Sequence, residues 1–298
     1  MKNTPYNRKD KLAIILQCSG IGDCLFASSV IKKIYQINNN KFLFDIFTCH
    51  PKLFKTCPYI NKPYDIKDKT KLQLYEKQIV LFDTSKYKHW LMDTFDFISL
   101  PIGIGQLSFR EKQLEYFPIE KDKSEIFDVV INTSITWPSR SWPIESWQKL
   151  ADVILKLGYS VAVVGKDIWS ETDKILKKSA GLEGCTDLTN KLSLDQTYYT
   201  IKNSKLFITC QNGLSVLSGA TEVEIIVLDM SIEWSKRAIY RNEDPHYKVT
   251  YVKGNCPLYC CQSFKCPLNN SDKHFKCIPG VEKVIDVVIK KLSGIRAQ

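Results

Sequence analysis

The sequence lacks an apolar run long enough to cross a bilayer, and residues 1–11 lack the apolar core of a signal peptide. It also lacks short-period repeats and low-complexity tracts. These absences argue against an integral membrane protein, a secreted precursor and a solenoid. We therefore expect a cytoplasmic protein, which can contact the inner membrane surface only as a peripheral partner.

Acidic residues are too few to balance the basic ones. Lys and Arg number 42 and Asp and Glu number 32, which gives a formal charge of +10. This excess favours an anionic partner, and a nucleotide, a phosphorylated glycan, a nucleic acid and an acidic membrane surface all qualify. With 298 residues, 44% of them hydrophobic, the chain exceeds one typical domain and predicts two cores.

The stretch 18–23, Cys-Ser-Gly-Ile-Gly-Asp, is a predicted strand-to-helix turn. The apolar run 12–16 precedes it as a buried strand, and 25–35 follows with the apolar spacing of a helix. Gly20 and Gly22 allow a ligand to approach the main chain closely. Asp23 then lies at the helix start, either as an N-cap or as a general base, and the local pattern does not choose between them.

The rest of the first half alternates strands and helices. Residues 42–48 and 78–83 are predicted strands, and 52–64, with three prolines in or beside it, is predicted as loop with a short helical piece. Residues 89–100 are predicted as a surface helix with Asp96 on its wet face, whereas His89 could face the same site as Asp23. The alternation indicates an α/β protein with a parallel sheet.

The polar segment 117–128 is a predicted linker, after which the pattern starts again. We therefore predict an N-terminal domain over 1–120 and a C-terminal domain over 121–298, each Rossmann-like. The second domain contains predicted strands at 126–131, 160–164, 206–209 and 224–228, helices at 143–157 and 214–221, and a closing helix at 281–292.

Several residues at strand ends of the second domain suit a phosphate. Thr133 and Ser134 supply hydroxyls and amides after one strand, and Arg140 follows in a Trp-Pro-Ser-Arg-Ser-Trp-Pro context. Gln211, Asn212, Gly213, Leu214 and Ser215 form a tight turn into a helix, whose free amides and dipole attract anions. Together they predict a nucleotide site.

The order of these motifs resembles the heptosyltransferase family of glycosyltransferases, which includes the ADP-heptose:lipopolysaccharide heptosyltransferases. The resemblance rests on Gly-Ile-Gly-Asp-Cys-Leu-Phe-Ala-Ser-Ser-Val-Ile at 20–31, Trp-Pro-Ser-Arg-Ser-Trp-Pro-Ile-Glu-Ser-Trp at 137–147, Asp-Leu-Thr-Asn-Lys-Leu-Ser-Leu at 187–194 and Gln-Asn-Gly-Leu-Ser at 211–215. It implies the GT-B fold, two Rossmann-like domains facing across a cleft. It also implies an inverting, metal-independent transfer, with the acceptor on the first domain and the nucleotide-sugar on the second.

The resemblance assigns roles to individual residues. Asp23 matches the catalytic base that deprotonates the acceptor hydroxyl, and Arg140 falls where the family usually has a lysine that stabilises the departing diphosphate. Thr133 and Ser134 match the phosphate-side loop, and Glu171 or Asp167 takes the acidic ribose-binding role. The turn 211–215 matches the family's Asp-Thr/Ser-Gly turn, but Gln211 and Asn212 replace its first two residues. Val216 stands where many members have histidine.

The chain has 11 cysteines, and five of them crowd into 256–277 without the paired Cys-x-x-Cys spacing of a zinc ribbon. Four thiolates in one loop suit zinc or iron, and a loop of free thiols is the equal alternative. Similar C-terminal cysteine patterns occur in the resembled family, and some autotransporter heptosyltransferase relatives bind iron through them. We expect Cys256, Cys260, Cys266 and Cys277 as ligands of a structural metal, with Cys261 to spare.

The sequence therefore predicts an inverting glycosyltransferase that uses a nucleotide-sugar, with ADP-heptose as the first donor to test. The acceptor is a lipopolysaccharide-type glycan or a protein hydroxyl, so a role in lipopolysaccharide biosynthesis is one option. The charge of +10 keeps a nucleic-acid glycosyltransferase as an alternative. The altered turn at Gln211 and Asn212 favours a second alternative, which is a metal-stabilised nucleotide- or sugar-binding protein without turnover.

Overall fold

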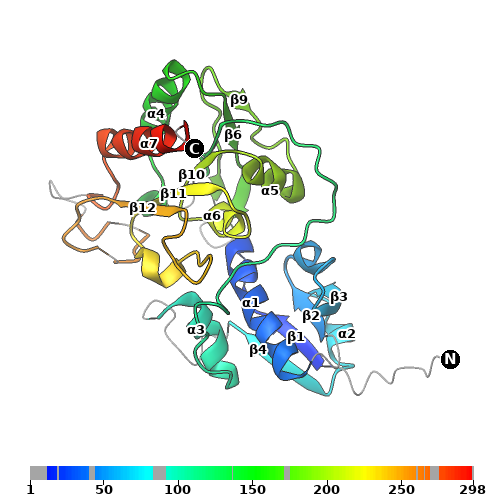
Figure 1. Ribbon diagram of the computed structural model, residues 1–298. Helices are drawn as coiled ribbons and strands as arrows, with labels where there is room; N and C mark the ends of the chain where they lie inside the picture. The colour runs from blue at the N-terminus through cyan, green and yellow to red at the C-terminus, as the bar shows by residue number, and fades with distance from the viewer. Residues whose placement is uncertain are drawn as a thin grey trace. The chain divides into compact units, whose positions relative to one another are not determined.

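The computed structural model describes residues 12–18, 20–39, 44–82, 92–135, 137–170, 175–259, 261–264, 266–268 and 275–296 (Figure 1). The chain forms two compact units, which are described separately. The first contains the chain up to Ile119 together with Tyr240–Asp244, and the second contains Glu120–Ile239 and the chain from Pro245 onward. The sequence of Tyr240–Asp244 gives no signal that this segment belongs to the first unit.

The first unit is built on a parallel sheet of four strands in the order β3-β2-β1-β4. The strands are β1 (Leu12–Leu16), β2 (Phe44–Thr48), β3 (Ile60–Asp65) and β4 (Lys77–Leu81). Every residue of β2 is buried, as expected for a central parallel strand. The helices are α1 (Ile21–Ile37), α2 (Lys69–Leu72) and α3 (Thr94–Ser99), with short 3₁₀ turns η2 (Pro51–Phe54) and η4 (Leu100–Ile102).

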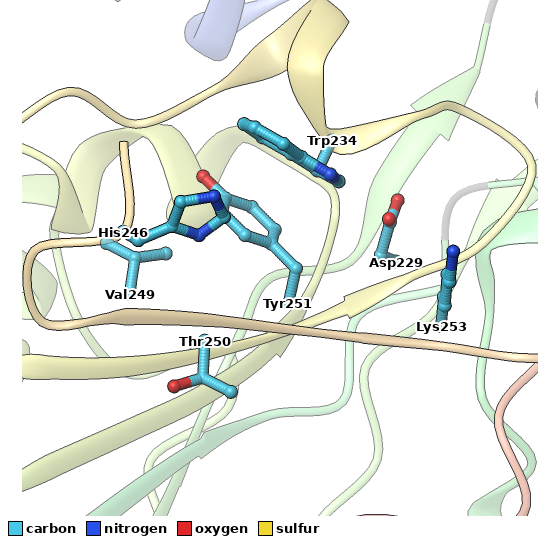
Figure 2. Close-up of a pocket in the computed structure, with 7 residues that line it drawn as sticks. All are labelled: Asp229, Trp234, His246, Val249, Thr250, Tyr251 and Lys253. Carbon is cyan, nitrogen blue, oxygen red and sulfur yellow. The ribbon is translucent and has the colours of Figure 1, made fainter. Parts of the chain in front are cut away.

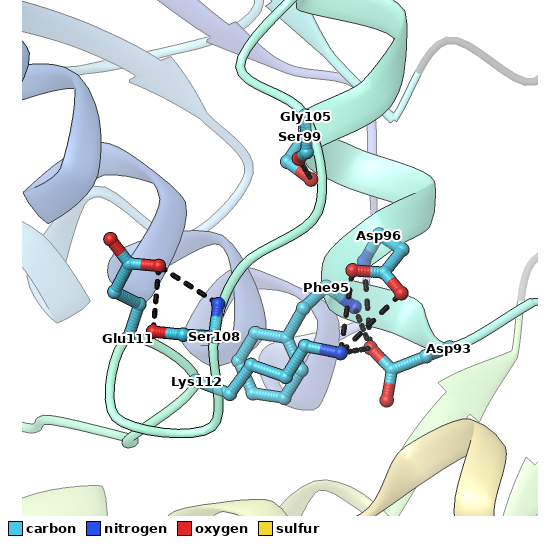
Figure 3. Close-up of polar contacts among 8 residues, drawn as sticks. All are labelled: Asp93, Phe95, Asp96, Ser99, Gly105, Ser108, Glu111 and Lys112. Atoms are coloured by element: carbon cyan, nitrogen blue, oxygen red, sulfur yellow. Dashed lines mark hydrogen bonds and ion pairs between the residues drawn. The ribbon is translucent and has the colours of Figure 1, made fainter.

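Two expectations for this unit are wrong. In the predicted loop 52–64 the expected short helical piece exists as η2, but the segment also contains most of β3, because β3 is an edge strand and an edge strand tolerates Pro63. Asp96 is buried rather than on a wet face, since α3 begins only at Thr94 and is buried along its whole length. Figure 3 shows the reason: the ammonium group of Lys112, which is also buried, points between the carboxylates of Asp93 and Asp96.

The second unit is built on a parallel sheet of six strands in the order β12-β11-β10-β5-β6-β9. The strands are β5 (Val129–Asn132), β6 (Val161–Val164), β9 (Thr186–Asp187), β10 (Leu206–Cys210), β11 (Glu224–Asp229) and β12 (Val249–Lys253). A separate antiparallel pair joins β7 (Ile168–Ser170) to β8 (Ile175–Lys177).

The helices of the second unit are α4 (Ile144–Lys156), α5 (Leu194–Lys202), α6 (Gly213–Ser218) and α7 (Val281–Arg296), with 3₁₀ turns η5 (Pro138–Arg140) and η6 (Trp234–Arg237). Val284, Val288 and Leu292 recur every four residues on α7 and are buried in the core of this unit. The predicted closing helix therefore exists and packs against α4. Among the described residues, no helix combines the length and apolarity needed to cross a membrane.

The strand order of each sheet reverses at one point. In the first sheet the chain builds β1, β2 and β3 outward and then places β4 on the other side of β1. In the second sheet β5, β6 and β9 run to one edge, and β10 to β12 continue from the other side of β5. Open α/β sheets bind ligands beyond the carboxyl ends of the strands at such reversals. The loops after β1, β5 and β10 are therefore the places to examine.

Candidate functional site

The loop after β1 carries Asp23 at the reversal point of the first sheet. Helix α1 begins at Ile21 with Gly20 as its N-cap, so Asp23 lies in the first turn and is not the capping residue. A methyl group on Gly20 would lie 2.7 Å from Asp23 Oδ2. A side chain at position 20 would therefore displace the Asp23 carboxylate from its place over the loop.

Two thiols flank this loop. Cys18 Sγ lies 3.5 Å from Cys24 Sγ, and Cys24 Sγ lies 3.6 Å from Thr48 Oγ1 at the end of β2. The hydrogen bond with Cys24 and burial both raise the pKa of Cys18. Cys18 therefore stays a neutral thiol, whereas its hydrogen bond lowers the pKa of the buried Cys24. Asp23 is the carboxylate that this loop offers.

In the second unit, Asn132 joins the ends of β5, β6 and β10. It is fully buried, and its Nδ2 donates to Val164 O at 2.9 Å and to Ser134 Oγ at 2.8 Å. Its Oδ1 accepts from Asn212 Nδ2 at 2.6 Å and from Thr209 Oγ1 at 3.2 Å. The loops after β5 and β10 are thus fixed to each other at the reversal point.

The hydroxyls of Thr133 and Ser134 are both engaged by the segment after β8. Thr133 Oγ1 donates to Ala180 O at 2.7 Å, and Ser134 Oγ lies 2.8 Å from Ser179 Oγ. Asp167 Oδ1 accepts from the Ser179 backbone at 2.8 Å. Thr133 is buried and Ser134 half-buried, so Ser134 is the more accessible of the two for a ligand.

The turn 211–215 lies where the sequence predicts it, but the amides of Leu214 and Ser215 are already capped within the turn. Asn212 caps α6: its Oδ1 accepts from Leu214 N at 2.9 Å and from Ser215 N at 3.3 Å. Ser215 Oγ in turn accepts from Asn212 N at 3.2 Å. The expectation of open amides after Gly213 is therefore wrong for this conformation, because asparagine is itself a strong N-cap.

Arg140 ends η5, and its guanidinium stacks on Trp137, with Cζ 4.5 Å from the ring centroid. Its positive charge is close enough to Cys210, at the end of β10, to lower the pKa of that thiol, although burial dominates and raises it to about 12. Arg140 is thus a cation beside the reversal point of the second sheet. An Arg held on an aromatic face has its planar fork oriented for a phosphate.

Asp229, the last residue of β11, is a site residue that was not predicted from the sequence. It is fully buried; its Oδ1 accepts from Gln211 Nε2 at 3.0 Å, and its Oδ2 accepts from the hydroxyl of Tyr259. Burial raises the pKa of Asp229 from 3.8 to about 6, while hydrogen bonds from Tyr259 and the Trp234 backbone lower it. A carboxylate directly after an apolar strand was a usable signal, since it stands at the sheet edge that binds ligands.

A cavity of about 430 Å³ opens beside Asp229 (Figure 2). Trp234 and Tyr251 stack with ring centroids 5.2 Å apart, and His246 lies against both rings. Figure 2 shows Asp229 and Lys253 at the opposite end of this cavity. The cavity therefore combines an aromatic wall with a charged end.

The thiols of the cysteine-rich loop, residues 256–277, gather around Cys277. Burial and, after it, the nearby thiols of Cys256, Cys261 and Cys266 together raise the pKa of Cys277 to about 11. A sulfur-only set suits zinc or iron. Within the part of the chain that the structure describes, however, no three His, Cys, Asp or Glu side chains converge closely enough to hold a metal ion. Cys261, expected to be spare, belongs to this group.

Three expected residues cannot be placed. Glu171, Cys260 and His89 all lie outside the described residues. Val216 is buried in α6.

Known proteins resemble this chain in sequence and in fold. Residues 99–228 match the family model of glycosyltransferase family 9 (heptosyltransferase). No curated protein sequence shows significant similarity to the chain. The resemblance to the heptosyltransferase family noted in the sequence is therefore confirmed over this central segment.

Solved structures extend the likeness to nearly the whole chain. TibC from enterotoxigenic E. coli, an iron-containing dodecameric glycosyltransferase, superposes with a TM-score of 0.73 at 16% identity, over 97% of this chain and 81% of TibC. A family 9 glycosyltransferase from Veillonella parvula gives 0.69 at 11% identity, over 96% of this chain and 98% of its own. E. coli WaaC with ADP gives 0.57 at 13% identity, over 94% and 99%. These likenesses confirm the GT-B fold class with two Rossmann-like units.

Proposed function

We propose that this chain, which shares its fold with family 9 heptosyltransferases, transfers a sugar from a nucleotide-diphosphate donor to a hydroxyl group. The observation that carries this proposal is the placement of two charged side chains. Asp23 and Arg140 each stand in a loop at the reversal point of their own sheet, where open α/β sheets bind ligands. A base and a cation are the two groups that an inverting, metal-independent transfer needs.

The first unit binds the acceptor in this proposal. The acceptor oxygen attacks the anomeric carbon as Asp23 takes its proton. A new carbon–oxygen bond forms, and the bond from the anomeric carbon to the β-phosphate oxygen breaks with its electron pair going to the phosphate. Attack opposite to the leaving group inverts the anomeric configuration.

The second unit binds the donor. Arg140 stabilises the charge that develops on the departing diphosphate, and Ser134 and the turn 211–215 contact the phosphates. Asp167 or Glu171 holds the ribose. ADP-heptose is the donor to test first, because TibC was solved in complex with ADP-D-β-D-heptose and WaaC with ADP. The acceptor is a lipopolysaccharide-type glycan or a protein hydroxyl.

We also propose that the cysteine-rich loop binds zinc or iron through Cys256, Cys260, Cys266 and Cys277. The support is the gathering of thiols around Cys277, together with the iron that TibC contains. Such a metal is structural here and takes part in no step of the transfer.

The test is nucleotide binding followed by turnover. ADP, GDP, UDP and CMP are compared by the melting temperature of the protein, since a ligand of the folded state raises it in proportion to affinity. We expect ADP to give the largest shift. Arg140→Ala should reduce that shift, and Arg110→Ala, which removes the same charge from an exposed position of the first unit, should not.

Turnover is then measured as ADP release from ADP-heptose with a lipopolysaccharide core acceptor or a Ser/Thr-rich polypeptide. Asp23→Asn should keep the ADP shift and lose turnover by about 10²-fold or more, the usual worth of a general base. Full turnover by Asp23→Asn would refute the mechanism.

A protein without turnover is the second candidate. It is favoured by the capping of the Leu214 and Ser215 amides by Asn212, which leaves these amides unavailable to a phosphate in this conformation. The same melting experiment separates the two candidates. Absence of any nucleotide shift contradicts the transferase, whereas a shift without turnover on either acceptor class supports the binding protein.

A further inference from the structure

The cysteine-rich loop is attached to the strand ends that form the candidate donor site. Ser139 Oγ, beside Arg140, donates to Ser263 O at 2.6 Å, and Gln262 N donates to Ser231 O at 2.9 Å. Ser139 Oγ also lies 3.1 Å from Ser231 Oγ. The loop is therefore linked both to η5, which carries Arg140, and to the chain that follows β11.

A third link passes through side chains alone. The hydroxyl of Tyr259, in the cysteine-rich loop, donates to Asp229 Oδ2, and Gln211 Nε2 donates to Asp229 Oδ1 at 3.0 Å. Gln211 is the first residue of the turn 211–215, and its Oε1 is buried without a hydrogen-bond partner among the described residues. Within the part of the chain that the structure describes, the hydrogen bond to Asp229 is thus the one that orients the Gln211 side-chain amide.

Asp229 accepts hydrogen bonds from the side chains of Tyr259 and Gln211 and from the Trp234 backbone. A buried carboxylate is costly unless each oxygen accepts hydrogen bonds, and the charges nearby oppose each other, since Glu233 disfavours and Lys253 favours the ionised form. Lys253 is itself placed by Tyr259, with Nζ 5.3 Å from the ring centroid. Without the Tyr259 hydroxyl, Asp229 Oδ2 loses its side-chain donor, and the carboxylate keeps only the hydrogen bonds from Gln211 and the Trp234 backbone among the described residues. A carboxylate with one donor fewer no longer has its position, and that of the Gln211 amide, fixed from both sides.

We propose that Tyr259 is a positioning residue of the donor site: through Asp229, its hydroxyl fixes Gln211 and with it the turn 211–215. This role rests on the proposed function, because it assumes that the turn contacts the diphosphate. It also explains how the chain uses glutamine at a position where the resembled family has aspartate. The carboxylate stands on the neighbouring strand, and the glutamine connects it to the turn.

The experiment measures the Kd of ADP by calorimetry for Tyr259→Phe, which removes one hydroxyl and keeps the ring. The matched control is Tyr159→Phe in the same unit, whose hydroxyl donates at 3.2 Å to Leu292 O on α7. We expect Tyr259→Phe to weaken ADP about fivefold or more, the size of an ordinary coupling between linked sites, and Tyr159→Phe to leave the Kd unchanged. Metal content, measured in parallel, should be the same in both variants.

A second experiment tests whether Tyr259 affects ADP binding through Asp229. In an Asp229→Asn background, Tyr259→Phe should change the Kd by less than about twofold, because residues that act through one contact are not additive. If the two substitutions change the Kd of ADP additively, Tyr259 does not act through Asp229. A Tyr259→Phe protein that fails to fold while Tyr159→Phe folds would mean a structural role only.

The outcomes separate this proposal from the proposed function. If the wild-type protein binds ADP and Tyr259→Phe binds it equally well, only the positioning role fails. If the wild-type protein binds no nucleotide, the proposed function fails and the positioning role fails with it.

Discussion

Asn212 Nδ2 donates to Asn132 Oδ1 over 2.6 Å, and this contact joins β10 to β5 where the strand order of the second sheet reverses. Asn132 is fully buried, and its side chain also forms hydrogen bonds with Thr209, Ser134 and Val164. The same residue therefore fixes the candidate donor site and satisfies buried polar groups. Its removal should affect stability before it affects chemistry.

We predict that Asn132→Ala lowers the free energy of unfolding by about 2–4 kcal/mol, because several buried polar groups lose their partner at once. Urea denaturation measures the loss. Asn203→Ala is the control: its Nδ2 donates to Asp122 and Ser124 at a half-buried position, and its loss should cost less than about 1 kcal/mol. Equal losses in the two variants would contradict the central role of Asn132.

The buried carboxyl of Asp229 should make stability depend on pH. Burial raises its pKa from 3.8 to about 6, so between these values the folded protein binds more protons than the unfolded chain does. Stability from this group is then present below pH 4 and is lost as the pH rises to 6. Relative to Asp229→Asn, the free energy of unfolding of the wild-type protein should fall by about 3 kcal/mol across this window. If the difference in the free energy of unfolding between the two proteins stays constant from pH 4 to pH 6, the pKa of Asp229 is not raised.

Lys112 should be essential for folding of the first unit. Its Nζ lies 3.4 Å from Asp93 Oδ1 and 3.3 Å from Asp96 Oδ1 in a buried group, shown in Figure 3. Lys112→Met leaves the carboxylates of the buried Asp96 and the partly buried Asp93 without their cation and should cost about 3–5 kcal/mol. Lys33→Met, which removes a partner of Glu111 at a more exposed position, should cost less than about 1 kcal/mol. Similar melting temperatures for Lys112→Met and Lys33→Met would contradict the expected larger loss of stability in Lys112→Met.

The cysteine-rich loop should carry metal in the purified protein. Elemental analysis is expected to find about one zinc or iron per chain, held by four thiolates. Cys266→Ser should lower this content, and Cys185→Ser, a change to a half-buried cysteine far along the chain, should not. Removal of the metal with a chelator should lower the melting temperature of the wild-type protein. A wild-type protein without metal would favour a loop of free thiols.

The sequence determined the architecture. Apolar runs were sufficient to predict the central strands β1, β2, β5, β6, β10 and β11, because burial on both faces dictates their composition, and the edge strand β4 was predicted from a shorter apolar run. The helices α1, α4 and α7 were predicted from apolar residues at helical spacing. The sequence also located the loops that carry Asp23, Arg140 and the turn 211–215. Weakly patterned elements such as β3, β12 and α5 were missed, since edge strands and half-exposed helices carry little periodic signal.

Only the tertiary structure decided how the polar side chains pair. Asp96 looked like a surface residue until Lys112, distant in sequence, was found against it. Asp229 had no assigned role until Gln211 and Tyr259 were found on its two oxygens. The capping of the Leu214 amide by Asn212 is different, because it is a local contact that the preference of asparagine for the N-cap could have predicted. Hydrophobic periodicity is a local property and can be read along the chain. The partner of a buried polar group is chosen by the packing of strands far apart in sequence, which the order of residues does not state.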